Sequence, residues 1–205
     1  MTKSAKHAII VAHPNAQSFN MSVAARYRES VEKLGCATVT RDLYRLDFQP
    51  ALHDGEIPRP AGFAAAPDIA AERALIADAQ VFAFIYPLWF NVPPAILVGY
   101  IQRVFGMGFG YGRQHGGANA RLLLGRSMIS FSSSGAPAEW LRTEGGWNAL
   151  RNLFDDHVAD VCGMTVIDHR HYGRVLNATP ACRIDAHLRD VEETVARCFK
   201  DKRAN

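Results

Sequence analysis

The sequence predicts an α/β protein with a doubly wound, five-stranded parallel sheet and helices on both faces of that sheet. Five short apolar runs alternate along the chain with longer segments whose apolar residues recur at helical spacing. Two of the runs, residues 8–12 and 81–86, are apolar throughout, as expected for strands that are buried on both faces. A helix between successive strands predicts parallel pairing, because it carries the chain back to the same edge of the sheet.

The size and composition of the chain are those of a globular protein. Its 205 residues predict a single domain over residues 1–205. Apolar residues make up 48% and charged residues 21%, which excludes a disordered, collagen-like or coiled-coil chain. The net charge is +3 and the charges are scattered, so we expect no nucleic-acid or membrane-binding patch.

The first strand, residues 8–12, leads into a polar loop, HPNAQSFN, at residues 13–20. Ser18 or Asn20 is a suitable cap for the helix that follows, and Gly35 is suited to end it. The apolar face of this helix is formed by Val23, Tyr27, Val31 and Leu34.

The second strand is predicted at residues 36–43, and a long irregular connection follows at residues 47–67. Loops of this length in compact domains are usually functional or mobile. Asp68 is expected to cap the next helix, before the third strand at residues 81–86. The apolar residues of that helix are Ile69, Leu75, Ile76 and Ala79.

Residues 79–101 form a mostly apolar stretch that is long enough to span a membrane as a helix. Pro87, Asn91 and the pair Pro93-Pro94 lie inside it, and adjacent prolines would break such a helix. We therefore predict a buried strand, a turn and a helix from Ala95 to about Met107, with no membrane insertion.

The second half of the chain begins with a glycine-rich stretch at residues 106–120. A fourth strand is predicted at residues 127–132, followed by a serine-rich loop at residues 132–140. An amphipathic helix ends at Gly163, and a fifth strand follows at residues 164–167. The apolar residues of that helix and of the last helix are Trp147, Leu150, Phe154, Val158 and Val161, then Ile184, Leu188, Val191, Val195 and Phe199.

Five strands in this alternation fit the flavodoxin-like strand order 2-1-3-4-5. Ligands of such sheets bind beyond the carboxyl ends of the strands, at the point where the strand order reverses. The loops after the first, third and fourth strands are therefore the candidate binding site.

The loop after the first strand has the features of a phosphate site. The N-terminus of a helix carries partial positive charge and free N–H groups, and Ser18, Asn20 and Ser22 add hydroxyl and amide donors. His13 is a further hydrogen-bond donor, whether charged or neutral. The alternative is that Ser18 and Asn20 only cap the helix.

The other two loops offer aromatic rings and hydroxyl groups. Trp89 and Phe90 either stack on a flat ligand or a partner chain, or are core residues. Gly135 in the serine-rich loop allows a ligand to approach the backbone closely. No G-x-S-x-G surrounds a serine of this loop, so it is not the nucleophile elbow of a hydrolase.

No metal site is expected. Asp168, His169 and His171 lack a further ligand spaced on a rigid element. The four cysteines have no metal-ligand spacing and are expected to be buried, reduced thiols. The N-terminal residues do not resemble a signal peptide, and together these features predict a cytoplasmic protein.

Taken together, the three loops resemble the NAD(P)H:quinone oxidoreductase family of flavodoxin-like fold, which includes modulator-of-drug-activity-type bacterial flavin reductases. HPNAQSFN is similar to the H-P-x-x-x-S-F-N of that family. PLWFNVPPAILVGYIQRVFGMGFGYG, residues 87–112, resembles P-L-x-W-x-x-P-A-x-L-K-G-W-x-D-R-V-x-x-x-G-F-A-Y. The serine-rich loop stands where the family often has T-T-G-G, and the resemblance extends to the CGM at residues 162–164.

The resemblance implies a flavin cofactor, FAD in preference to FMN, and NADPH or NADH as co-substrate. It places the flavin phosphate on His13, Ser18, Phe19, Asn20 and Ser22. It places the isoalloxazine ring on Pro87, Leu88, Trp89, Phe90 and Asn91 and the pyrimidine end of that ring on Ser132, Ser133, Ser134 and Gly135. It also places Phe109 and Tyr111 on the substrate side, across a homodimer interface.

The implied reaction is transfer of two electrons from NAD(P)H through the flavin to a quinone or similar aromatic acceptor. The chain departs from the family at Val98, Gln102 and Ser134, where lysine, aspartate and glycine are common. It also lacks a histidine matching one that some relatives have after the third loop, so no protein acid or base is assigned. The alternatives are a flavin-bearing regulatory subunit of an ion-efflux transporter, a flavodoxin-type electron carrier, and an azo- or nitroreductase.

Overall fold

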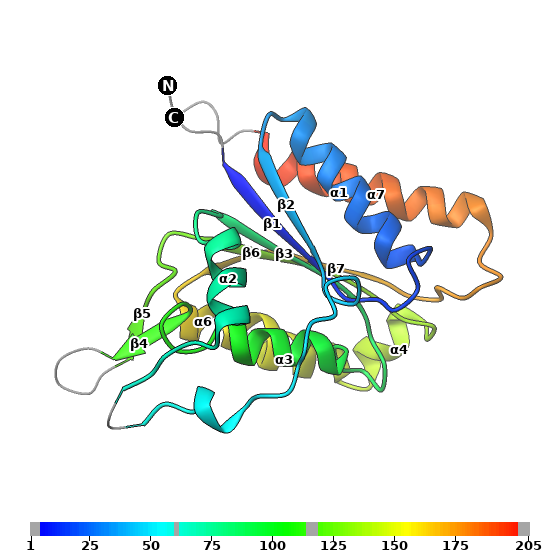
Figure 1. Cartoon of the computed structure of the whole chain (residues 1–205). Helices are drawn as coiled ribbons and strands as arrows, with labels where there is room; N and C mark the ends of the chain where they lie inside the picture. Colours follow the sequence, from blue (N-terminus) through cyan, green and yellow to red (C-terminus); the bar gives the residue numbers. More distant parts are fainter. Residues whose placement is uncertain (1–4, 60–61, 114–118, 201–205) are drawn as a thin grey trace.

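The computed structural model describes residues 5–59, 62–113 and 119–200, which are arranged around a five-stranded parallel sheet (Figure 1). The order of the strands in this sheet is β2-β1-β3-β6-β7, which is the predicted order 2-1-3-4-5. The strands are β1 (Lys6–Val11), β2 (Ala37–Asp42), β3 (Val81–Pro87), β6 (Ser127–Ser133) and β7 (Thr165–Tyr172). The predicted fold class is thus confirmed, whereas a single domain over residues 1–205 stays a prediction.

Helices cover both faces of the sheet. On one face lie α1 (Phe19–Lys33) and α7 (Ala181–Phe199), which contact each other. On the other face lie α2 (Pro67–Ile76), α3 (Ala95–Val104) and α6 (His157–Cys162). A short helix α5 (Gly146–Leu150) and a π-helical segment η2 (Arg151–Asp156) run directly into α6. Two further short helices are η1 (Asp54–Glu56) and α4 (Ala138–Thr143).

The central strands supply a core to each face because successive residues point in opposite directions. Ile10 of β1 and Phe84 of β3 pack beneath α2, α3 and α6. Ile9 and Ile85 of the same strands pack beneath α1 and α7. The continuous apolar runs at residues 8–12 and 81–86 are therefore strands buried on both faces, as predicted.

The start of α2 differs from the prediction. Ala66 is the N-cap and Pro67 is the first helical residue, so Asp68 does not cap the helix. Proline suits this position because its missing N–H would have no acceptor inside the helix. Asp68 lies in the first turn instead, where it forms an ion pair with Arg103 of α3. Leu75, expected on the apolar face of this helix, is exposed.

The fifth strand was predicted too short. The predicted strand covers residues 164–167, whereas β7 extends to Tyr172. Asp168 and Arg170 face α7, where they form ion pairs with Arg197 and Asp190. The prediction of this strand used apolar residues only, and the polar residues in the second half of this edge strand therefore made it look shorter than it is.

The glycine-rich stretch contains a two-stranded antiparallel hairpin that the sequence reading missed, β4 (Tyr111–Arg113) and β5 (Asn119–Arg121). Residues 114–118, between these strands, lie outside the described residues. The expectation about the cysteines was only partly right. Cys162 is buried, but Cys182 is exposed.

The long connection at residues 47–67 is anchored by Arg103, whose side chain is almost fully buried. Its guanidinium donates to the carbonyl of Gln49 at 2.6 Å and to the carboxylate of Glu56 at 3.0 Å. The connection is therefore irregular but tied to α3 over its first part.

None of the helices in the described part of the chain is long and apolar enough to span a bilayer.

Candidate functional site

The carboxyl ends of β1, β3 and β6 bring the three predicted loops around one polar cleft of about 570 Å³. The cleft lies where the strand order reverses between β1 and β3, as expected for a doubly wound sheet. The predicted residues that line it are His13, Ser18, Phe19, Asn20, Ser22, Pro87, Leu88, Trp89, Ser133, Ser134 and Gly135. We call this cavity the polar cleft.

The N-terminus of α1 gives the polar cleft its anion-binding end. The Ser18 hydroxyl accepts a hydrogen bond from the Met21 N–H at 3.3 Å, and the Ser18 carbonyl accepts one from the Ser22 N–H at 3.1 Å. The N–H groups of Phe19 and Asn20 have no acceptor inside the helix. With the helix dipole, these groups suit a phosphate. Ser18 is therefore the cap, as one of the two predicted alternatives had it.

Hydrogen bonds fold the loop between β1 and α1. The Asn15 N–H donates to His13 Nδ1 at 3.0 Å, and Arg45 donates to the carbonyls of His13 (2.8 Å) and Pro14. Partial burial lowers the pKa of His13; as smaller effects, the hydrogen bond from Asn15 raises it and the charge of Arg45 lowers it further. Near pH 7 the His13 imidazole is neutral. Its Nδ1 accepts, so its Nε2–H donates.

The second loop is a tight turn with mutual backbone hydrogen bonds of 3.1 Å between Trp89 and Val92. Phe90 and Asn91, its two central residues, have φ values of 52° and 61°, as in a type I′ turn. Trp89 is half-exposed at the rim of the polar cleft, with its ring 5.9 Å from that of His13. Phe90 points into solvent and lines no part of the polar cleft, and Asn91 borders a different cavity. The structure thus separates these two residues from the others predicted to line the isoalloxazine ring.

The third loop contributes Ser133, Ser134 and Gly135 to the polar cleft but not Ser132. Ser132 has no exposed surface, and its hydroxyl lies 2.7 Å from His169 Nε2 and 2.9 Å from His171 Nδ1. Ser132 therefore does not line the polar cleft, and its contact with the ligand stays a prediction.

One wall of the polar cleft was not predicted. It is formed by the segment after β7 and the first turn of α7, with Val175, Leu176, Asn177, Thr179 and Ile184. A turn closes this segment, since the Thr179 hydroxyl accepts from the Leu176 N–H at 2.8 Å. The turn-forming residues Asn-Ala-Thr-Pro at 177–180 were the available signal. A fifth strand that ends at residue 167 places these residues far from the carboxyl end of the sheet, so the prediction does not include them.

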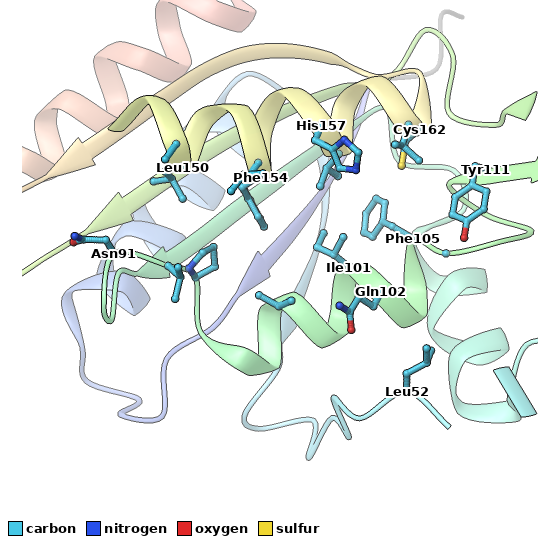
Figure 2. A pocket seen from close by; sticks show the side chains of 18 residues that line it. Leu52, Asn91, Ile101, Gln102, Phe105, Tyr111, Leu150, Phe154, His157 and Cys162 are labelled. Carbon is cyan, nitrogen blue, oxygen red and sulfur yellow. The ribbon is translucent and has the colours of Figure 1, made fainter. Parts of the chain in front are cut away.

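A second, apolar cavity of about 680 Å³ lies between α3 and the helical run from α5 to α6 (Figure 2). We call it the apolar groove. Ile101 of α3 and Phe105, which directly follows α3, face Leu150 and Phe154 across it, with Tyr111 at one end. Tyr111 and Asn91 thus lie here rather than in the polar cleft.

Phe109, the other predicted substrate residue, borders neither cavity. Its ring packs edge-on against Phe82 and Phe105, with centroids 6.4 and 5.6 Å apart. A role of Phe109 at the substrate stays a prediction. Within the described ranges, no group of three or more His, Cys, Asp or Glu side chains is placed to hold a metal ion.

The polar cleft has the donors and the shape for a flat, phosphate-bearing ligand. N–H groups and hydroxyls at the start of α1 suit the phosphate, and the indole of Trp89 offers a stacking surface. Backbone and hydroxyls of Ser133–Gly135 suit the polar edge of a heterocycle. A flavin phosphate fits this donor set. Fold and site together define the class of doubly wound proteins that bind a nucleotide-type cofactor at the switch point.

Comparison with known proteins gives the family. Residues 5–195 match the flavodoxin-like fold family, and the chain belongs to this family. It is 30% identical over 170 residues to an uncharacterized NAD(P)H oxidoreductase from Haemophilus influenzae, covering 82% of this chain and 84% of the relative.

Two solved structures extend the comparison. The NAD(P)H:quinone oxidoreductase from Methanothermobacter marburgensis has a TM-score of 0.83 and 26% identity, over 94% of this chain and 96% of that one. An FMN-dependent NADH-azoreductase from Bacillus anthracis, solved in complex with FMN, has a TM-score of 0.71 and 18% identity, over 94% and 98%. The azoreductase shows that the fold is shared.

Proposed function

We propose that the protein is a flavin-dependent NAD(P)H dehydrogenase (quinone), which passes two electrons from NAD(P)H to a quinone-like acceptor. The observation that carries the proposal is the polar cleft, where the predicted loops meet at the switch point of the sheet. The relatives named NAD(P)H oxidoreductase and NAD(P)H:quinone oxidoreductase support the same activity.

The residues of the polar cleft have separate tasks in this proposal. The α1 N-terminus, Ser18 and Ser22 hold the phosphate, and Trp89 stacks against the ring system. N–H groups of the third loop near Gly135 stabilise negative charge on the ring edge. The flavin, when bound, accepts a hydride from NAD(P)H and passes two electrons on. FAD rather than FMN remains the proposed cofactor.

The homodimer and the cytoplasmic location also remain proposals. The exposed apolar side chains Phe90, Val92 and Leu153 lie on or beside the apolar groove, and such a patch favours contact with a second chain. In the dimer, Tyr111 would approach the acceptor bound at the neighbouring polar cleft.

The test is an absorbance spectrum of the purified protein, with the released cofactor identified by mass. A yellow protein that NADPH bleaches and a soluble naphthoquinone reoxidises, with no protein partner added, supports the reductase. A flavoprotein that NADPH or NADH does not reduce favours the electron carrier. A colourless protein that takes up neither FAD nor FMN overturns the proposal.

A further inference from the structure

Behind the third loop, five side chains form one continuous hydrogen-bonded row. Asp155 Oδ2 lies 2.5 Å from His169 Nδ1, and His169 Nε2 lies 2.7 Å from Ser132 Oγ. Ser132 Oγ lies 2.9 Å from His171 Nδ1, and His171 Nε2 lies 3.0 Å from Ser134 Oγ. Ser134 lines the polar cleft, so the row runs from a buried carboxylate to the candidate cofactor site. We call these five side chains the relay residues.

The register of the sheet brings the row together. Ser132 of β6 pairs with His171 of β7, and Ser130 pairs with His169, so these side chains share one face of the sheet. The π-helical segment η2 places Asp155 over that face. Asp155 and His169 have fully buried side chains.

The connectivity Ser132–His169–Asp155 is that of a hydrolytic triad, but the hydroxyl cannot act as a nucleophile. Ser132 has no exposed surface, and a second imidazole, that of His171, occupies its other side. A substrate carbonyl therefore cannot reach the Ser132 oxygen. What this row can move is a proton.

We propose that the relay residues conduct a proton between the polar cleft and the Asp155–His169 pair, which holds it. In one arrangement every hydrogen bond points toward Asp155. Ser134 donates to His171 Nε2, and His171 Nδ1–H donates to Ser132. Ser132 then donates to His169 Nε2, and His169 Nδ1–H donates to Asp155.

Uptake of one proton from the cleft reverses three of these bonds. The proton binds His171 Nε2, and the Nδ1 proton of His171 passes to Ser132. Ser132 gives its own proton to His169 Nε2. The result is a charged His169 imidazolium beside the Asp155 carboxylate, with His171 and Ser132 again neutral. Atoms and charge balance, since one proton enters and one is stored.

The end of the row at the cleft allows both arrangements. The Ser134 hydroxyl lies within reach of two acceptors, His171 Nε2 at 3.0 Å and the carbonyl of Ala136 at 2.9 Å. It donates to His171 in the first arrangement and to Ala136 in the second. In the second, His171 Nε2–H donates to the Ser134 oxygen, so no polar atom of the row loses its partner.

The surroundings of His171 oppose storage of the proton on His171 itself. Burial, with smaller effects from the neighbouring His169 and Arg142, lowers the pKa of His171 to about 4. Trp147 covers both imidazoles, with ring centroids 4.8 and 6.0 Å away. His171 is thus neutral at pH 7 and serves as the conductor.

The other groups packed against the buried pair are Tyr86 and Ser130. Burial and Asp155 raise the pKa of the Tyr86 phenol, so it stays neutral. The Ser130 hydroxyl donates to Asp155 Oδ1 at 2.7 Å. Asp168 and Arg170 of β7 lie on the opposite face of the strand, where they form ion pairs with Arg197 and Asp190 of α7. Asp155 is therefore the anion that faces His169 directly.

The use of such a relay rests on the proposed function. Reduction of a quinone by NAD(P)H consumes one proton per turnover, because a hydride alone leaves the product one proton short. A stored proton that returns through Ser134 supplies it at the polar cleft. The relay residues thus take the acid–base role that the sequence left unassigned.

A pair of matched substitutions tests the relay. Ser132→Ala removes the hydroxyl that joins the two imidazoles. Ser130→Ala is its control, because it removes a buried hydroxyl two residues away on the same face that contacts Asp155 but lies off the path. Histidine ¹⁵N NMR of the full chain as purified, titrated over pH, follows both imidazoles, with signals assigned from His169→Gln and His171→Gln. No cofactor is needed for this measurement.

In the wild type and in Ser130→Ala, we expect His171 to change from the Nδ1–H to the Nε2–H tautomer in step with protonation of His169. In Ser132→Ala this change should be lost. A His171 tautomer that stays constant in the wild type, or follows His169 equally in Ser132→Ala, overturns the relay.

Proton uptake on reduction of the flavin-loaded protein is the second readout, measured with an indicator dye in weak buffer. Ser132→Ala should take up about one proton fewer per flavin than the wild type near neutral pH, and Ser130→Ala should match the wild type. Equal uptake in all three proteins overturns coupling of the relay to the flavin. Failure to load any flavin overturns the proposed function instead, and the NMR titration still decides the relay.

Discussion

The Ser133 hydroxyl donates a hydrogen bond to Asn20 Oδ1 across 3.0 Å and joins the end of β6 to the first turn of α1. Both residues are buried, and both line the polar cleft. Two segments whose bonded residues are 113 positions apart in the chain are thereby held at a fixed distance. A ligand that touches both ends of the cleft depends on this link.

We expect Asn20→Ala to weaken flavin binding by roughly tenfold, about 1.4 kcal/mol, because it leaves Ser133 without its partner. The dissociation constant from flavin fluorescence quenching measures this effect. Ser30→Ala is the control, since Ser30 is a buried serine of the same helix whose hydroxyl donates to the Arg26 carbonyl, away from the polar cleft. Equal affinities of the two variants would contradict the prediction.

The turn of the second loop separates two aromatic rings, and the variants Trp89→Ala and Phe90→Ala distinguish them. Trp89 borders the polar cleft, whereas Phe90 is fully exposed at positive φ. We expect Trp89→Ala to lower flavin affinity through loss of stacking worth roughly 0.5–1.5 kcal/mol. Phe90→Ala should leave the affinity of the isolated chain unchanged. Titration calorimetry compares the two, and a larger loss in Phe90→Ala would count against the assignment.

Arg103 is expected to be the strongest anchor of the long connection. Its side chain is 1% exposed and contacts the buried carboxylate of Glu56. Arg103→Met should lower the free energy of unfolding by roughly 3–5 kcal/mol, because it leaves that carboxylate buried and unpaired. Urea denaturation measures the loss. Arg59→Met removes the exposed pair with Asp54 and should cost less than about 1 kcal/mol.

The helix glycine Gly99 allows the connection to approach α3. A Cβ at Gly99 would overlap the backbone and side chain of Pro50. We expect Gly99→Ala to destabilise the protein by roughly 1–3 kcal/mol, seen as a lower midpoint of thermal or urea unfolding. Gly55→Ala is the control, because a Cβ there meets nothing within 4 Å. Equal stability of the two variants would show that the connection can shift away.

Buried His7 predicts loss of stability in acid. Burial lowers its pKa from 6.5 to about 4, while its Nδ1 lies 2.8 Å from the Tyr27 hydroxyl. Between these pH values the unfolded chain binds a proton that the folded protein excludes, so stability falls as the pH falls. Over this range His7 alone accounts for about 3 kcal/mol.

The variant His7→Gln tests this pH dependence by urea unfolding at pH 7, 5.5 and 4. The decline in stability toward acid should be smaller in the variant than in the wild type by about the amount assigned to His7. His157→Gln, a change of an exposed histidine, should keep the wild-type decline. A parallel decline in all three proteins would assign the acid sensitivity to other groups.

Much of the fold followed from local patterns. The buried strands at residues 8–12 and 81–86 carry continuous apolar runs, and Gly35 and Gly163 follow the helix ends with positive φ. The full length of the edge strand β7 was not predicted, because its residues facing α7 are charged and those on its other face are histidines. Because the predicted strand was too short, the prediction also missed the wall of the polar cleft formed after β7 and the contact between His169 and Ser132.

The sequence by itself determined the strand order and which three loops meet at the candidate site, because apolar periodicity and helix-capping residues act over a few positions. Only the tertiary structure decided that Ser132 faces two histidines rather than the cleft, and that Phe90 points away from it. It also decided that Asp155 lies over His169. These outcomes depend on the register between β6 and β7, on one tight turn and on a π-helical segment. Contacts between residues far apart in the chain set all three, and no local pattern encodes them.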